Sequence, residues 1–240
     1  MSSVAVQDGG QLHFLFVRHG ETQDNIDRIL QGLRDTSLTD KGLREAGVLA
    51  EKLQDQRVDA VYHSPLIRMV QTIQPILAHR SDVTVQADSD LTGQALGELE
   101  GGSYDTIDMS NPRSADGQPG VELFDDFVSR VKRSFSRTVG TESRRVGEQD
   151  RVVLIATHGV AITSLFKALE ASPSCDGFNA KVAIRGPEAY EVRWTDSDDV
   201  AKLVVPRPAE LPVSDGSLDW SALSGQPFLI ERWGKKEKAL

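Results

Sequence analysis

A short apolar strand that runs directly into charged and imidazole side chains constrains this chain more than any other feature. Residues 14–17 are Phe-Leu-Phe-Val, and Arg18, His19 and Gly20 follow them without a break. An uninterrupted apolar run bounded by glycine predicts a strand that is buried on both faces of a sheet. Open α/β sheets bind their ligands at the carboxyl ends of the strands, so we expect Arg18 and His19 to form part of an anion site.

A second stretch of the chain has the same form. Residues 152–156 are Val-Val-Leu-Ile-Ala, and they run into Thr157, His158 and Gly159. The apolar residues that follow predict a helix beginning at this point. We therefore predict that the two strand ends meet in space and that one phosphoryl group is held between the two imidazoles.

Strands and helices alternate along most of the chain. Apolar runs predict strands at 12–17, 58–62, 83–85 and 152–156, and helical periodicity predicts helices at 40–54, from residue 64, around 124–135 and after residue 159. This alternation predicts an α/β fold of three layers, α/β/α, in which a mainly parallel sheet is covered by helices on both faces.

Local signals predict where two of these helices begin. Thr39 is a good N-cap for the helix over 40–54, whose buried stripe we expect at Leu43, Ala46, Ala50 and Leu53. Ser64 followed by proline predicts an N-cap with proline at the first helical position.

The remaining segments set the expected domain boundaries. Residues 88–120 are rich in glycine and proline, and so long an irregular stretch within a domain is usually functional. Further strands are predicted at 181–184, 190–194 and 202–205. We expect an N-terminal tail over 1–11, one domain over 12–205, and an extension over 206–240 that packs on the same domain.

Composition excludes several classes of function. The net charge of −9 disfavours a nucleic-acid partner that is recognised through general basicity. A single cysteine, Cys175, permits no intrachain disulfide, which fits a reducing compartment. The N-terminus lacks the apolar core of a signal peptide, and no run approaches the roughly 20 apolar residues that span a bilayer. We expect a cytoplasmic protein, with a nuclear location not excluded and no membrane partner.

The charged residues at the strand ends suit the chemistry of a phosphomonoester. The guanidinium groups of Arg18 and Arg68 match the phosphoryl oxygens in bidentate fashion. A neutral His19 imidazole is able to attack phosphorus and form a phosphohistidine. A protonated His158, with the backbone N–H groups that begin at Gly159, would hold the oxygens as charge builds on them. This chemistry requires no metal and no cofactor.

Several motifs in chain order are similar to those of the histidine phosphatase superfamily, the phosphoglycerate-mutase-like fold. Together they span residues 12–170 and comprise Arg18-His19-Gly20-Glu21-Thr22 with Asn25, Leu30-Gln31-Gly32, Leu38-Thr39 with Gly42, Ser64-Pro65 with Arg68 and Gln71-Thr72, Pro119-Gly120-Val121-Glu122, and Thr157-His158-Gly159. The resemblance implies that His19 is the nucleophile and that Arg18, Arg68 and His158 bind the phosphoryl group. It also places Asn25 beside the pocket.

One position departs from the pattern of the family. The resemblance implies a glutamate proton donor where this chain has Gly93, although the flanking residues of 91–101 align. Asp90, Glu98 and Glu21 are the candidates for a substitute acid. Loss of a general acid typically lowers the rate by about 10²–10⁴.

The resemblance implies a phosphatase that hydrolyses a small phosphorylated metabolite through a phosphohistidine at His19. A catalytically weakened binding or scaffold protein is the alternative, because the acid position is Gly93. A phosphoglycerate mutase is the third reading, and the moderate length of the insertion before residue 119 favours phosphatase over mutase.

Overall fold

The computed structural model describes residues 12–111, 113–147, 149–170 and 200–205, with short strands at 213–214, 217–218 and 229–233. The predicted tail over 1–11, the predicted strands at 181–184 and 190–194, and Cys175 lie outside these residues. None of the helices within these ranges is both long enough and apolar enough to cross a membrane.

The core of the fold is a six-stranded sheet in the order β3-β2-β4-β1-β5-β8. Its parallel part consists of β1 (Leu12–Arg18), β2 (Ala60–His63), β3 (Thr84–Ala87) and β4 (Arg151–Thr157). On the far side of β1, β5 (Val200–Val205) runs antiparallel to it, and β8 (Leu229–Trp233) runs antiparallel to β5. A separate small hairpin joins β6 (Val213–Ser214) to β7 (Ser217–Leu218).

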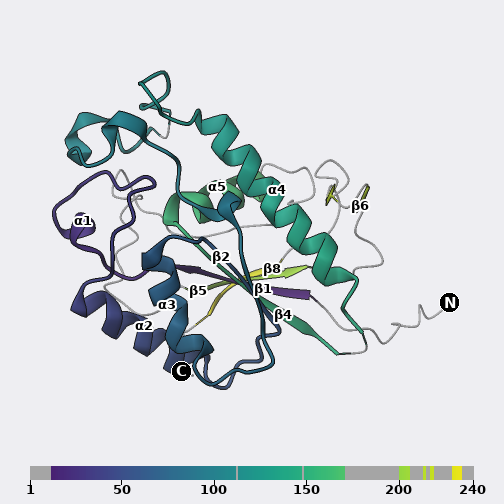
Figure 1. Ribbon diagram of the computed structural model, residues 1–240. Helices are drawn as coiled ribbons and strands as arrows, with labels where there is room; N and C mark the ends of the chain where they lie inside the picture. The colour runs from purple at the N-terminus through teal and green to yellow at the C-terminus, as the bar shows by residue number, and fades with distance from the viewer. Residues whose placement is uncertain are drawn as a thin grey trace, which may run out of the picture.

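Helices cover both faces of the sheet (Figure 1). One face carries α2 (Asp40–Leu53) and α3 (Ile67–Leu77), and the other carries α4 (Phe124–Ser143) and α5 (Gly159–Glu170). The connections at the carboxyl end of the sheet contain α1 (Gln23–Ile26) and the 3₁₀ turns η1 (Ser89–Leu91), η2 (Gly97–Leu99) and η3 (Tyr104–Thr106). The predicted three-layer α/β fold is confirmed.

The β1 strand builds two apolar cores because its side chains alternate between the two faces. Phe14 and Phe16 pack against Phe135 of α4, with ring centroids 5.0 and 6.0 Å apart respectively. Leu15 and Val17 point to the opposite face, where they join the apolar residues of α2 and α3. Burial on both faces fixes β1 in the middle of the sheet, so its polar carboxyl end, at Arg18, lies at a fixed position on the edge of the sheet.

The start of α2 confirms one local prediction and corrects another. Thr39 is the N-cap, and its hydroxyl accepts a hydrogen bond from the Gly42 N–H at 3.0 Å. Leu43, however, is 47% exposed and does not belong to the buried stripe. Gly42 is buried instead, because the backbone of Glu21 lies directly against it. A Cβ at Gly42 would come within 2.2 Å of the Glu21 carbonyl oxygen. The stripe is therefore rotated toward Gly42 and Leu49 by the close approach of the loop after β1.

The predicted start of α3 is wrong by two residues. Ser64 does not cap this helix, which has Leu66 as its N-cap residue and begins at Ile67. The first helical N–H, that of Ile67, donates instead to the Asp35 carboxylate at 2.6 Å. A carboxylate 32 positions earlier in the chain replaces the local cap, and the Ser64 side chain is used elsewhere.

Candidate active site

Two neighbouring parallel strands bring the two histidines together. In the register of β1 and β4, Arg18 lies opposite Thr157, so the residues that follow each strand emerge side by side. The rings of His19 and His158 have centroids 5.3 Å apart and an interplanar angle of 57°. The two strand ends meet as the sequence predicts.

The hydrogen bonding of His19 defines which of its nitrogens is able to attack. Nδ1 lies 2.8 Å from the carbonyl oxygen of Gly20, which can only accept, so Nδ1 carries the proton. Burial, reinforced by Arg18 and Arg68, lowers the pKa of His19 well below its usual value. The imidazole is therefore neutral at neutral pH, and its Nε2 carries the lone pair that a nucleophile needs.

The loop around His19 is fixed by contacts with α2 and α3. The Gly20 N–H donates to the Thr72 hydroxyl at 3.1 Å, and that hydroxyl donates to the Arg68 carbonyl at 2.7 Å. A Cβ at Gly20 would lie 2.7 Å from the Gly42 carbonyl oxygen, so a side chain has no room there. These contacts explain why glycine occupies positions 20 and 42, where the loop after β1 packs against the start of α2.

His158 is held by partners on both ring nitrogens. Nδ1 lies 3.4 Å from an Arg68 nitrogen, which can only donate, and Nε2 lies 3.0 Å from the Ser64 hydroxyl. Burial lowers the pKa of His158 well below its usual value, and the nearby Arg68 adds to this effect. His158 is thus neutral with its proton on Nε2 in this arrangement, because two guanidinium groups already supply positive charge in a buried site. Its protonation when a phosphoryl group is bound stays a prediction.

Arg68 is held by backbone carbonyls. Only 2% of this residue is exposed, and its two terminal nitrogens donate to the carbonyl oxygens of Arg34 at 2.6 Å and Gly32 at 3.0 Å. Burial lowers the pKa of Arg68 to about 10, which still leaves the group charged at neutral pH. Carbonyl partners orient the planar guanidinium without neutralising it, so its charge is available to an anion.

The four residues border one cleft at the carboxyl end of the sheet. Arg18, His19, Arg68 and His158 all line it. Asn25 and Gly159, the other predicted phosphate-binding residues, line it as well. The Asn25 side-chain oxygen accepts from the Thr22 N–H at 3.1 Å in a capping box, so its amide N–H groups are the part able to donate to an anion.

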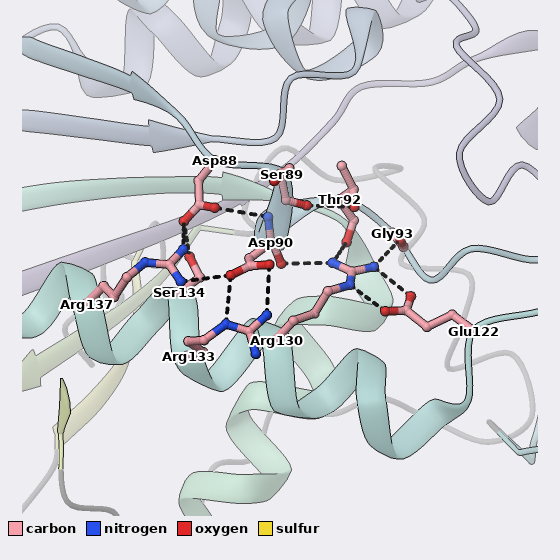
Figure 2. Close-up of polar contacts among 10 residues, drawn as sticks. All are labelled: Asp88, Ser89, Asp90, Thr92, Gly93, Glu122, Arg130, Arg133, Ser134 and Arg137. Atoms are coloured by element: carbon pink, nitrogen blue, oxygen red, sulfur yellow. Dashed lines mark hydrogen bonds and ion pairs between the residues drawn. The ribbon is translucent and has the colours of Figure 1, made fainter.

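The candidate acids lie elsewhere. Glu98 is exposed on η2, and the Glu21 carboxylate pairs with Lys41 at 2.8 Å. The Asp90 carboxylate pairs with Arg133 at 3.1 Å and Arg137 at 2.8 Å on α4 (Figure 2). Burial raises the pKa of Asp90, but the two arginines outweigh burial and leave it below its ordinary value. None of the three is among the described residues that line the cleft.

Arg130 of α4 binds the backbone of residues 90–93, which lead into the cleft wall, and we call this arrangement the Arg130 clamp (Figure 2). Its guanidinium donates to the carbonyl oxygens of Asp90 at 2.9 Å, Thr92 at 3.0 Å and Gly93 at 2.7 Å, and it also pairs with Glu122 at 2.6 Å. Sequence reasoning missed this clamp. Its signal was the spacing of arginines at 130, 133 and 137, which places three cations on one helical face.

The fold and the cleft define an α/β protein that presents two imidazoles and two guanidinium groups at the carboxyl end of its sheet. The chain belongs to the histidine phosphatase superfamily (branch 1), whose family model matches residues 14–203. The resemblance seen in the sequence motifs is thereby confirmed.

Three known proteins illustrate the relationship. Phosphoglycerate mutase-like protein 4 of Arabidopsis thaliana is 32% identical over 172 residues, which cover 67% of this chain and 72% of the relative. A broad-specificity phosphatase of Saccharomyces cerevisiae is 28% identical over 169 residues, covering 68% of this chain and 72% of that protein. The structure of phosphoglycerate mutase from Bacillus anthracis has the same fold, with a TM-score of 0.64 and 22% identity over 91% of this chain and 97% of that one.

Proposed function

We propose that this protein hydrolyses a small phosphorylated metabolite through a phosphohistidine at His19. The observation that supports this proposal best is the protonation of the His19 ring. Its Nδ1–H donates a hydrogen bond to the Gly20 carbonyl oxygen, and its Nε2 is unprotonated in a cleft that contains two guanidinium groups. The phosphatase name of the Saccharomyces cerevisiae relative supports hydrolysis as the reaction.

The proposed reaction has two displacements. The lone pair of His19 Nε2 forms a bond to phosphorus, and the bond between phosphorus and the ester oxygen breaks with its electron pair on that oxygen. Arg18 and Arg68 donate to the phosphoryl oxygens during the transfer, and the neutral His158, whose Nε2–H rests on the Ser64 hydroxyl, lies beside them. The oxygen of water then forms a bond to phosphorus, the bond between phosphorus and Nε2 breaks with its electron pair on His19, and the water protons leave with the phosphate product.

The test is turnover of p-nitrophenyl phosphate by the protein and by a His19→Gln variant. A His79→Gln variant is the matched control, because His79 is exposed just beyond the end of α3. We expect His19→Gln to abolish turnover and His79→Gln to retain it. Undiminished turnover by His19→Gln would refute the assignment.

A binding or scaffold role is the second candidate, and the absence of a carboxyl group beside His158 among the described residues favours it. A protein of this kind would bind inorganic phosphate through Arg18 and Arg68 but would release no phosphate from any ester. Calorimetric binding of phosphate together with no turnover across a panel of phosphorylated sugars, glycerates and phosphoamino acids would support it. A mutase would instead exchange a phosphoryl group between two positions of phosphoglycerate.

A further inference from the structure

The basicity of the leaving oxygen in the first displacement decides whether the reaction needs a general acid to protonate it. An alkoxide is about as basic as hydroxide, whose conjugate acid has a pKa of about 15.7, and it must be protonated as it departs. A phenolic oxygen has a pKa of about 10, as in the tyrosine side chain, and it is able to depart as an anion. The proton donors of the cleft therefore indicate which kind of ester it accepts.

The described residues that line the cleft include no carboxylic acid that is protonated at neutral pH. Asp108 provides the only carboxyl group among the residues that line it, and Asp108 is exposed. Hydrogen bonds from Ser110 lower the pKa of Asp108, so it is ionised at neutral pH. The Nε2 proton of His158 lies against Ser64 on a neutral imidazole, which is a weak acid.

The wall beside His158 is a fixed piece of backbone. A Cβ built at Gly93 would lie 3.6 Å from His158 Cγ, so this residue faces the imidazole directly. The Thr157 hydroxyl holds the Leu91 carbonyl at 2.6 Å, and the Arg130 clamp holds the next two residues of the segment (Figure 2). These contacts keep Asp90 facing α4, so its carboxylate does not reach His158 without breaking them.

Beyond the phosphoryl site, apolar and aromatic side chains form the larger part of the cleft wall, beside the polar Gln31, Gln94, Asn111 and Ser114. Seven of the residues that line it present apolar or aromatic side chains: Leu30, Leu96, Tyr104, Ile107, Met109, Ala115 and Val160. Among the described lining residues the permanent cations are Arg18 and Arg68, and both belong to the phosphoryl site. The described lining therefore offers no further cation to a second phosphoryl group on the substrate.

We propose that the substrate is an aryl monophosphate, with an apolar aromatic ring directly on the ester oxygen and no second phosphoryl group. The ring packs on the apolar wall, and the phenolate leaves without a proton from a carboxylic acid. This inference rests on the proposed function, because it concerns the leaving group of the same reaction.

The test compares phenyl phosphate with benzyl phosphate, which have the same ring but a phenolic and an alkyl leaving oxygen respectively. We expect kcat/KM for phenyl phosphate to be higher by about 10²-fold or more, the usual contribution of a general acid. Equal values for the two esters would overturn the aryl proposal. If His19→Gln were inactive on both, the proposed phosphatase mechanism would still stand.

A Gly93→Glu variant provides the second arm, with Gly93→Gln as a control of equal size. The backbone of Gly93 lies outside the left-handed region, and its added Cβ makes only ordinary contacts, the nearest being the Gly32 carbonyl oxygen at 3.5 Å. We expect Gly93→Glu to raise the benzyl-to-phenyl ratio of kcat/KM at least tenfold above that of Gly93→Gln. A ratio that is the same in both variants would contradict the inference that a missing acid limits alkyl esters.

Discussion

Replacing Arg130 with methionine should release the segment that forms the wall beside His158. The Arg130 side chain is 12% exposed and its partner Glu122 is 19% exposed, so the pair is largely buried. The change leaves the Glu122 carboxylate and the Gly93 carbonyl without this donor. Removing one partner of a buried pair costs roughly 3–5 kcal/mol, and partial exposure places our expectation near the lower end, about 3 kcal/mol.

Arg133→Met is the matched control for this prediction. The Arg133 side chain is 58% exposed, and its partner Asp90 keeps a second ion pair with Arg137. Exposed pairs contribute roughly 0–1 kcal/mol, so the control should change the free energy of unfolding by less than about 1 kcal/mol. Urea denaturation at fixed pH measures both variants. A loss in Arg130→Met no larger than that in Arg133→Met would refute the clamp.

Activity gives a readout of the clamp that stability alone does not. Arg130 is one of the cations that lower the pKa of His158, so its removal should raise that pKa in the folded protein. We expect the pH profile of kcat/KM to shift toward higher pH in Arg130→Met and to stay in place in Arg133→Met. A stability loss with an unchanged profile would show that Arg130 has no influence on the cleft.

Three further predictions concern the histidines, the phosphoryl site and the core. Burial lowers the pKa of His19 and His158 in the folded protein, so the unfolded chain binds more protons below pH 6.5 and the free energy of unfolding falls as pH falls. Between pH 7 and 5.5 the variant with glutamine at both positions should lose less of this free energy than the unmodified protein, by up to about 1.3 kcal/mol per histidine, as measured by urea denaturation. Arg68→Lys keeps the charge but loses the fork that bonds two carbonyls, so kcat/KM should fall roughly 10²-fold in steady-state assays. Phe135→Ala, at a residue 1% exposed between the rings of β1, should cost about 3–5 kcal/mol in thermal unfolding.

The main features of the fold were predictable because they follow from burial. The runs at 14–17 and 152–156 have no polar residue to face water, so they had to become central strands. Parallel strands in a sheet end at the same edge, which is why His19 and His158 could be expected to meet. The histidines, the two arginines and Asn25 line one cleft for this reason.

The features that sequence reasoning missed depend on contacts between distant residues. Ser64 has the local signature of a helix cap, but its hydroxyl contacts His158 and the α3 N-terminus is satisfied by Asp35. Leu43 has the right spacing for burial, yet the loop after β1 occupies the space beside Gly42. Local patterns describe what a residue is able to do, whereas the tertiary fold decides which of its partners it meets.

For a similar physical reason, the sequence does not determine the proton donor. Asp90 and Glu98 flank position 93 in the sequence and Glu21 follows the nucleophile, so all three are candidates, and only their three-dimensional partners separate them. The Arg130 clamp, together with Arg133 and Arg137, could be located only once α4 was packed against η1 (Figure 2).

The most direct test of the account is to map the covalent intermediate. The protein is mixed with p-nitrophenyl phosphate and stopped with alkali within one turnover, since phosphohistidine survives base, and the digested peptides are sequenced by mass spectrometry. The account predicts one phosphoryl group on the peptide that contains His19, on the Nε2 nitrogen, and none in His19→Gln. Turnover with no phosphoryl group on that peptide, or a label on His158 instead, would contradict it.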